Sequence, residues 1–278
     1  GLKYCNWNRE LLENLWKGGI TAVHVTLVYW ENTEESFKKI FEIEKLIENN
    51  QDIVCHAKTT EDILNAKQDK KVAFIFGFQN SAPIVNNIFL LEKFFNKGLR
   101  FMQLTYNNQT PLAGGCFEPK DSGVSRFGKE VIEEMNRLGM IIDLSHAGKI
   151  SCLDAIEFSS KPVAISHANP SFFHKSLRNI DNDVLTKLVN KNGFIGLSLY
   201  PYHLKNSGNC KIDEFCQMIK ELINLIGSDN IGIGSDLCLN WPDEVVMWMR
   251  NGNWTKKTDY GESQDKNIKW PRQPEWYK

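Results

Sequence analysis

Three short stretches of this chain share one pattern: residues 140–146 read MIIDLSH, residues 163–167 read VAISH, and residues 231–236 read IGIGSD. Each is a run of β-branched or apolar residues, typical of a buried strand. Each run ends in a side chain that can bind a metal ion or carry a proton, namely His146, His167 and Asp236. The repetition indicates that several strands bring their last residues to one place.

Five further segments have the same apolar character, which gives eight predicted strands in all. The eight predicted strands are Ile20–Tyr29, Ile53–His56, Val72–Phe78, Leu99–Thr105, Met140–Ser145, Val163–His167, Phe194–Leu199 and Ile231–Ser235. Helical patterns lie between them, and alternating strands and helices indicate a parallel sheet. Because the strands are apolar almost throughout, we expect helices to cover the outer face of the sheet. No G-x-G-x-x-G motif follows any strand. We therefore predict an α/β fold, a (β/α)₈ TIM-type barrel, rather than an open doubly wound sheet.

The predicted helices carry recognisable start and stop signals. Ser125 is expected to cap a helix that ends at Gly139, and Asp181 to cap the next one. A third helix is predicted from about Ile212 to Ile226, with Gly227 closing it.

Composition and length limit the class of protein. The 278 residues fit a single barrel domain spanning 1–278, with 241–278 as an aromatic-rich loop or tail. The 33 basic and 34 acidic residues nearly cancel, and no basic block stands out, so we expect no nucleic-acid partner. No apolar run approaches the roughly 20 residues of a membrane span, so we expect no membrane partner. Seven scattered cysteines without a C-x-x-C pair favour reduced thiols and a cytoplasmic location.

The strand-end residues predict a metal-assisted site. In a barrel of this type the carboxyl ends of the strands form the mouth, where active sites are found. Two imidazoles on neighbouring strands, about 4.8 Å apart, can both reach one ion. Asp236 could bind the same ion or carry a proton. Asp143 is expected to support the site from deeper in the barrel. The alternative is that the two histidines are structural.

From roughly Leu99 to Asp236 the chain resembles the membrane (renal) dipeptidase family, zinc peptidases of the amidohydrolase superfamily. The segments that carry the resemblance are GLRFMQLTYNNQTPLA, GVSRFGKEVIEEMNRLGMIIDLSHAG, KPVAISHANPSFFHKSLRNIDNDVL and IGIGSDL. The resemblance implies that His146 and His167 bind zinc and that Arg178 holds the carboxylate of a substrate. It also implies that Asp236 transfers a proton.

The chain departs from the family pattern at several positions. The His-x-Asp motif that opens the family falls on Leu2 and Tyr4 here, the bridging glutamate is Gln79, and the loop histidine is Tyr106. Gln79 is expected to offer a neutral ligand oxygen, Tyr106 an acid–base group, and Asn107 and Tyr4 contacts to substrate. Because the charges that would offset two divalent cations are mostly gone, we expect one zinc ion rather than two.

The first hypothesis is therefore a dipeptidase-like metallohydrolase acting on a dipeptide or a related small amide. A metal-free barrel that only binds a small molecule remains open, as does a barrel with a changed reaction that uses Tyr106 or His146. His24 could replace a missing ligand or be a buried structural histidine, and His56 could line the mouth. The tryptophans of the C-terminal part (Trp241, Trp248, Trp254, Trp270 and Trp276) predict either packing and a homodimer interface, or a pocket for an apolar or cationic group.

Overall fold

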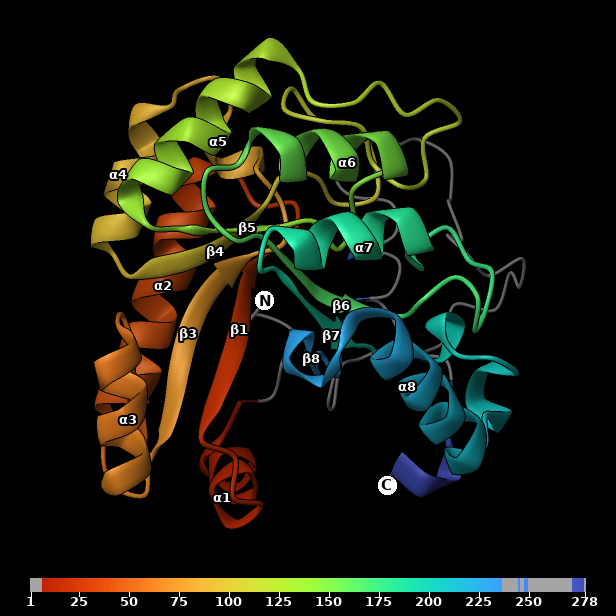
Figure 1. Cartoon of the computed structure of the whole chain (residues 1–278). Helices are drawn as coiled ribbons and strands as arrows, with labels where there is room; N and C mark the ends of the chain where they lie inside the picture. Colours follow the sequence, from red (N-terminus) through yellow and green to blue (C-terminus); the bar gives the residue numbers. More distant parts are fainter. Residues whose placement is uncertain (1–6, 237–244, 246–247, 250–271, 278) are drawn as a thin grey trace.

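A computed structural model describes residues 7–236, 245, 248–249 and 272–277 (Figure 1). Its sheet is wholly parallel, and its main path runs β1-β3-β4-β5-β6-β7-β8. The strands are β1 (Ala22–Val28), β2 (Val54–His56), β3 (Val72–Phe78), β4 (Leu99–Gln103), β5 (Ile141–Asp143), β6 (Ala164–Ala168), β7 (Phe194–Leu197) and β8 (Ile231–Ile233). Every predicted strand is present, and the α/β architecture of a TIM-type barrel is confirmed.

The position of β2 differs from the expected order. β2 pairs with Val72–Phe74 at the start of β3, whereas β4 pairs with β3 only from Phe76 onward. Since β1 occupies the other edge of β3 over Ala73–Phe78, β2 and β4 share one edge, end to end. β2 is therefore an added strand and does not stand between β1 and β3. Among the described residues no pairing joins β1 to β8.

Helices cover the outer face of the sheet, as Figure 1 shows for α4 to α7 over β4 and β5. They are α1 (Arg9–Lys17), α2 (Thr33–Glu48), α3 (Thr60–Gln68), α4 (Phe89–Asn96), α5 (Arg126–Leu138), α6 (Lys149–Phe158), α7 (Asn182–Asn190) and α8 (Ile212–Ile226). Short 3₁₀ helices span Ala82–Ile84, Pro201–His203, Ser207–Asn209, Ser228–Asn230 and Glu275–Tyr277.

The predicted helix ends are largely confirmed. The Ser125 hydroxyl accepts from the Gly128 N–H, and Gly139 ends α5 with a left-handed φ of 80°. α8 ends before Gly227 as expected. Asp181 holds the N-cap position of α7, but its carboxylate binds the Ser171 hydroxyl and the Lys149 ammonium instead of the helix N–H groups.

The core lies between the sheet and the helices. Neighbouring residues of a strand face opposite sides, and in β3 both Ala73 and Phe74 are fully buried. This confirms that β3 is covered on both faces. Polar side chains also occur in these strands close to their carboxyl ends, including Thr26, Gln103 and Asp143. A barrel interior is normally filled with branched apolar residues, so this polar group marks the end where a site can form.

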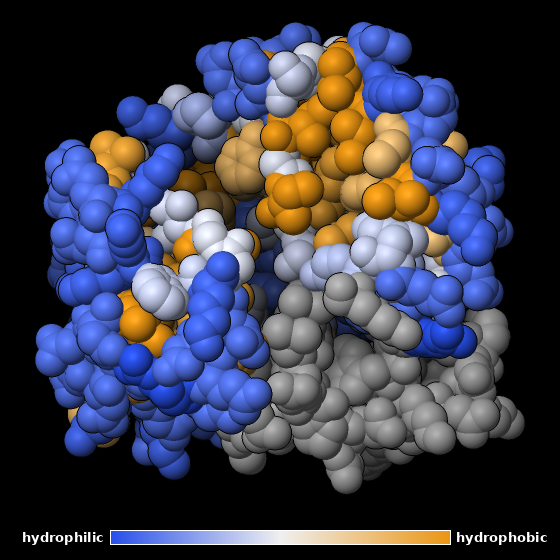
Figure 2. Space-filling view, turned by 90° about the horizontal axis from the view of Figure 1, so that it is seen from below, coloured by the Kyte–Doolittle hydropathy of each residue, from blue (hydrophilic) through white to orange (hydrophobic). Residues whose placement is uncertain are grey.

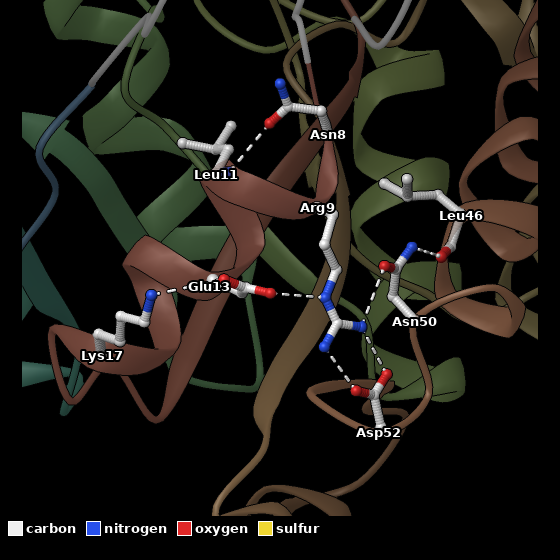
Figure 3. A network of polar contacts seen from close by, with 8 residues as sticks. All are labelled: Asn8, Arg9, Leu11, Glu13, Lys17, Leu46, Asn50 and Asp52. Atoms are coloured by element: carbon white, nitrogen blue, oxygen red, sulfur yellow. Dashed lines mark hydrogen bonds and ion pairs between the residues drawn. The ribbon is translucent and has the colours of Figure 1, made fainter.

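The N-terminal helix is joined to the turn before β2 by exposed polar contacts (Figure 3). The Arg9 guanidinium donates to Asp52 through both terminal nitrogens, at 2.7 and 2.6 Å, and to Glu13 at 2.9 Å. Such exposed ion pairs contribute little to stability, so they position α1 rather than hold the fold. Figure 2 shows the molecule from below, relative to Figure 1. On this face hydrophobic side chains gather beside a hollow, and hydrophilic side chains surround them.

Candidate active site

The two strand-end histidines meet at the mouth of the barrel. His146 follows β5 and His167 lies in β6, and their Nε2 atoms are 3.0 Å apart. Each residue is only 5% exposed. Burial lowers the pKa of both imidazoles, and the neighbouring Arg178 cation lowers them further, whereas the carboxylate of Asp236 opposes the shift at His167. The pair is therefore neutral at neutral pH.

A chain of hydrogen bonds fixes the ring of His167. Its Nδ1 lies 2.8 Å from the Ser166 hydroxyl, and that hydroxyl donates to the carboxylate of Asp143. Because the Ser166 proton is used on Asp143, the hydroxyl oxygen accepts from His167, whose own proton is then on Nδ1. Asp143 is fully surrounded by such donors: Ser145, Ser166 and Gln103 all donate to it. The Nε2 of His167 is left as an unprotonated acceptor.

The ring of His146 is fixed in a comparable way. Its Nδ1 lies 2.6 Å from the side-chain oxygen of Asn107, which can only accept, so this ring too carries its proton on Nδ1. Asn107 has a left-handed φ of 62°, a conformation that asparagine tolerates. The ring of Tyr106 stacks on the other side of the imidazole, with 4.3 Å between ring centroids. Asn107, predicted to contact substrate, thus contacts a histidine.

Two unprotonated nitrogens facing each other at 3.0 Å repel unless an electrophile lies between or beside them. Zinc–nitrogen bonds are about 2.1 Å long, so two of them at this separation would meet at about 90° on one ion. Within the described ranges no third histidine, cysteine, aspartate or glutamate completes a cluster with the pair. Over the described residues the two imidazoles thus fit as a pair of ligands to a divalent ion.

Arg178 is the cation that the pair contacts. Its Nη2 lies 3.2 Å from Nε2 of His146 and donates to the backbone oxygen of His167 at 3.3 Å. The residue is 3% exposed, and its Nη1 has no hydrogen-bond partner among the residues described. A buried guanidinium nitrogen without a partner is costly, and an anionic ligand would satisfy it.

The remaining predicted residues that the structure describes lie at the same end of the barrel. Asp236 lies three residues after the end of β8, with a left-handed φ of 54°, and its charge acts on His167. Gln79 is buried, and its amide nitrogen donates to the Thr26 hydroxyl at 2.9 Å. Tyr106 packs on His146 as described. Tyr4 lies outside the described residues, as does Leu2.

The other histidines have different environments. His24 stacks on Phe101 directly over Gly77, burial lowers its pKa to about 4, and its Nε2 has no hydrogen-bond partner in the described part of the chain. It is therefore bonded neither to backbone nor to the His146–His167 pair through that atom. His56 lies away from the mouth: β2 pairs with the start of β3, and the His56 ring packs on Phe76. His203 is buried, with Nδ1 on the Ser198 hydroxyl.

Ser166 is the positioning group that the sequence pattern did not single out. A usable signal was present, because both histidine strands end in Ser-His. Only the structure shows that the two serines differ: Ser166 contacts the His167 ring, whereas Ser145 accepts from the His167 backbone N–H.

Ser166→Ala is expected to weaken zinc binding by about 10- to 100-fold, the usual cost of removing a group that orients a ligand histidine. Nitrogen-15 NMR of the imidazoles should also show His167 losing its preference for the Nδ1–H form. Ser145→Ala is the matched control, because it removes an equal hydroxyl bonded to the same carboxylate but leaves the His167 ring contact. Equal effects of the two variants would contradict the role given to Ser166.

Comparisons with known proteins match this chain to dipeptidases. The family model described as membrane dipeptidase (Peptidase family M19) matches residues 7–243. Mouse dipeptidase 3 is 33% identical over 182 residues, which cover 63% of this chain and 36% of that protein. Dipeptidase tcpJ of Claviceps purpurea is 27% identical over 212 residues, 75% of this chain and 50% of that protein. The chain thus spans half or less of these curated relatives.

Solved structures agree with the sequence matches. A crystal structure of an amidohydrolase from Pseudomonas aeruginosa has a TM-score of 0.89 and 34% identity, covering 97% of this chain and 81% of that one. A metallopeptidase from Rhodobacter sphaeroides, liganded with a phosphinate mimic of the dipeptide L-Ala-D-Ala, shares the fold with a TM-score of 0.71, 20% identity and coverage of 76% and 63%. No described helix is long and apolar enough to cross a membrane. The chain belongs to the membrane dipeptidase family, Peptidase family M19.

Proposed function

We propose that this protein is a metal-dependent hydrolase of the amide bond in a dipeptide or a related small substrate that carries a carboxylate. The observation that carries the proposal is the facing pair of unprotonated Nε2 atoms of His146 and His167 at 3.0 Å. Both proton positions are set from outside the pair, by Ser166 and by Asn107. With both protons held on Nδ1, both Nε2 lone pairs can bind one cation.

His146 and His167 would hold zinc, which supplies positive charge to polarise a carbonyl and to make water more acidic. Side chains of the protein bind the substrate and transfer the proton. Arg178 binds the substrate carboxylate through its unpartnered Nη1, and this ionic contact fixes the amide relative to the histidines. Asp236 accepts a proton from the attacking water and delivers it to the leaving amine. Tyr106, stacked on His146, keeps that ring in place and excludes water from one face.

The proposal includes one ion rather than two. The position of the family's bridging glutamate is Gln79, a neutral amide whose nitrogen donates to Thr26. A second divalent cation would lack a compensating carboxylate there. We also propose that the protein acts in the cytoplasm and as a homodimer. The scattered cysteines without a C-x-x-C pair support the first part, and the aromatic residues of the C-terminal region support the second.

Metal content tests this proposal directly. Protein purified without chelator is expected to contain about one zinc per chain by elemental analysis and to hydrolyse members of a dipeptide and N-acyl amino acid panel. Dialysis against a chelator should remove both the zinc and the activity, and added zinc should restore them. Protein without bound metal that stays inactive after addition of zinc, iron or manganese would refute the proposal.

A second candidate function has one observation in its favour. The guanidinium of Arg178 already satisfies Nε2 of His146, at 3.2 Å, so the pair can be stable without a metal ion. In that case the barrel would bind a small carboxylate without cleaving it. Binding of an N-acyl amino acid that is unchanged by chelation, together with no hydrolysis, would favour this alternative.

A further inference from the structure

The loop that joins β4 to α5 is bonded to the backbone of His146. This loop spans residues 104–125. Its Gly115 pairs with Ala147 as an antiparallel β-bridge. The N–H of Cys116 donates to the backbone oxygen of His146 at 3.0 Å. The position of the His146 backbone is therefore set by this loop as well as by β5.

The same loop holds the imidazole of His146. The side-chain oxygen of Asn107 accepts the Nδ1–H of that ring at 2.6 Å. The backbone of Asn107 packs directly against Gly115, where a Cβ would lie 2.0 Å from the Asn107 carbonyl oxygen. Only glycine permits this approach. Asn107 therefore keeps its contact with His146 only while the part of the loop around Gly115 stays in place.

Asp121 binds this part of the loop to α6. Its Oδ1 accepts the Ser151 hydroxyl at 2.6 Å, and its Oδ2 accepts the Ser151 backbone N–H at 3.0 Å. The same hydroxyl oxygen accepts the Gly114 N–H at 2.9 Å, and Gly148 donates to the Gly114 oxygen at 2.9 Å. Ser151 is fully buried. We call Asp121, Ser151 and Gly114 the loop joint.

The loop joint also supplies the cap that α6 lacks. The N-cap residue of α6 is Gly148, which has no side chain to accept the N–H groups of the first turn. Asp121 accepts one of these groups, that of Ser151, from 30 positions earlier in the chain. A Cβ on Gly148 would lie 2.4 Å from Oδ2 of Asp121. The start of α6, directly after the His146 segment, thus depends on the loop for its capping group.

We propose that Asp121 is a positioning residue for His146. Its own bonds go to Ser151 and Gly123, so it acts through the loop joint, which keeps Asn107 on the imidazole. The inference rests on the proposed function for the use of Nε2 of His146 as a ligand. It adds to that function a residue outside the histidine pair on which the direction of this nitrogen depends.

Proton NMR of the chelator-treated full chain tests the proposal. The Nδ1–H of His146 is expected to exchange with water at least about tenfold faster in Asp121→Asn than in the wild type. Asparagine keeps the shape of the side chain but has one acceptor oxygen, whereas the bonds to Ser151 use two. The Nδ1–H of His167, bonded to Ser166, is the internal reference and should not change. Equal acceleration at both histidines would show general loosening and overturn the proposal.

Asp154→Asn is the matched control. Asp154 is also a half-buried aspartate between the loop and α6, and its Oδ2 accepts the Val124 N–H at 3.0 Å. Val124 lies at the end of the loop, next to the start of α5, and is not part of the loop joint. The control should leave exchange at His146 unchanged. If it accelerates exchange as much as Asp121→Asn does, or if Asp121→Asn has no effect, the assignment is wrong.

Ser151→Ala tests whether the effect passes through the loop joint. This variant removes the hydroxyl that bonds both Asp121 and Gly114, so it should also accelerate exchange at His146. Because both changes break one joint, the double variant should exceed the larger single effect only slightly. Effects that multiply would show that the two residues act separately and would contradict the proposed route. Thermal melting of each variant shows whether faster exchange reflects unfolding.

Zinc affinity is the second measurement, and it is expected to fall by about tenfold or more in Asp121→Asn, as for other groups that orient a ligand histidine. The exchange measurement needs neither metal nor turnover. Faster exchange in a protein that hydrolyses nothing would leave the role of Asp121 standing and reject only the hydrolase. Unchanged exchange in an active zinc enzyme would reject the role of Asp121 alone.

Discussion

Replacing His167 with alanine is expected to abolish bound zinc and to lower kcat/KM by more than about 100-fold. Even groups that only orient a metal ligand cost about 10- to 100-fold when removed, so loss of the ligand itself must cost more. The fold should survive, since removal of His167 takes away one ring contact with His146 and the contact with Ser166, while the backbone of β6 stays paired. Zinc content and single-substrate kinetics on the same preparation are the measurements.

The control for this variant is His174→Ala. His174 is a half-buried histidine in the loop before α7, and its hydrogen bond to Asn179 uses the backbone oxygen, which the substitution retains. It should keep both zinc and activity. If His167→Ala retains one zinc per chain, the ion is held elsewhere and the role given to the pair is wrong.

Gly77→Ala is expected to destabilise the protein by about 1–3 kcal/mol in the free energy of unfolding. A Cβ on Gly77 would lie 1.7 Å from Nε2 of His24, so the imidazole would have to leave its stacked position on Phe101. Gly232→Ala in β8 is the control, because a Cβ there meets no described atom within 4 Å. Urea unfolding of the two variants gives the comparison.

A double variant tests the cause. His24→Ala removes the ring that Gly77→Ala would collide with, so the combination should lose less stability than the sum of the two single changes. Additive losses would show that Gly77 is needed for another reason, such as backbone conformation.

The local pattern of the chain was enough to predict its elements. Apolar runs with polar boundaries identified all eight strands, and Ser125 and Gly139 marked the ends of α5 because capping and left-handed φ depend on neighbours in sequence. The same local reasoning failed for β2. Its three residues resemble any buried strand, and only the register against β3 decides that it is an added strand.

The sequence also predicted that His146 and His167 belong together, since residues at the carboxyl ends of neighbouring parallel strands must share one rim. It named Asp143 as a supporting residue, but not the contacts through which the two rings are held. The proton on His167 is set by a path through Ser166 to Asp143, and the proton on His146 by Asn107, 39 positions away along the chain. Such partners depend on side-chain direction, which no spacing rule gives.

Sequence alone thus determined the class of fold, the end of the barrel that carries the chemistry, and the residue types present there, because periodicity and strand-end position are properties of neighbouring residues. Tertiary structure alone decided that two imidazole nitrogens face each other unprotonated and that Arg178 contacts one of them. Those features arise from packing between segments far apart in the chain. Small differences in the distance between two such segments determine which side chains form hydrogen bonds.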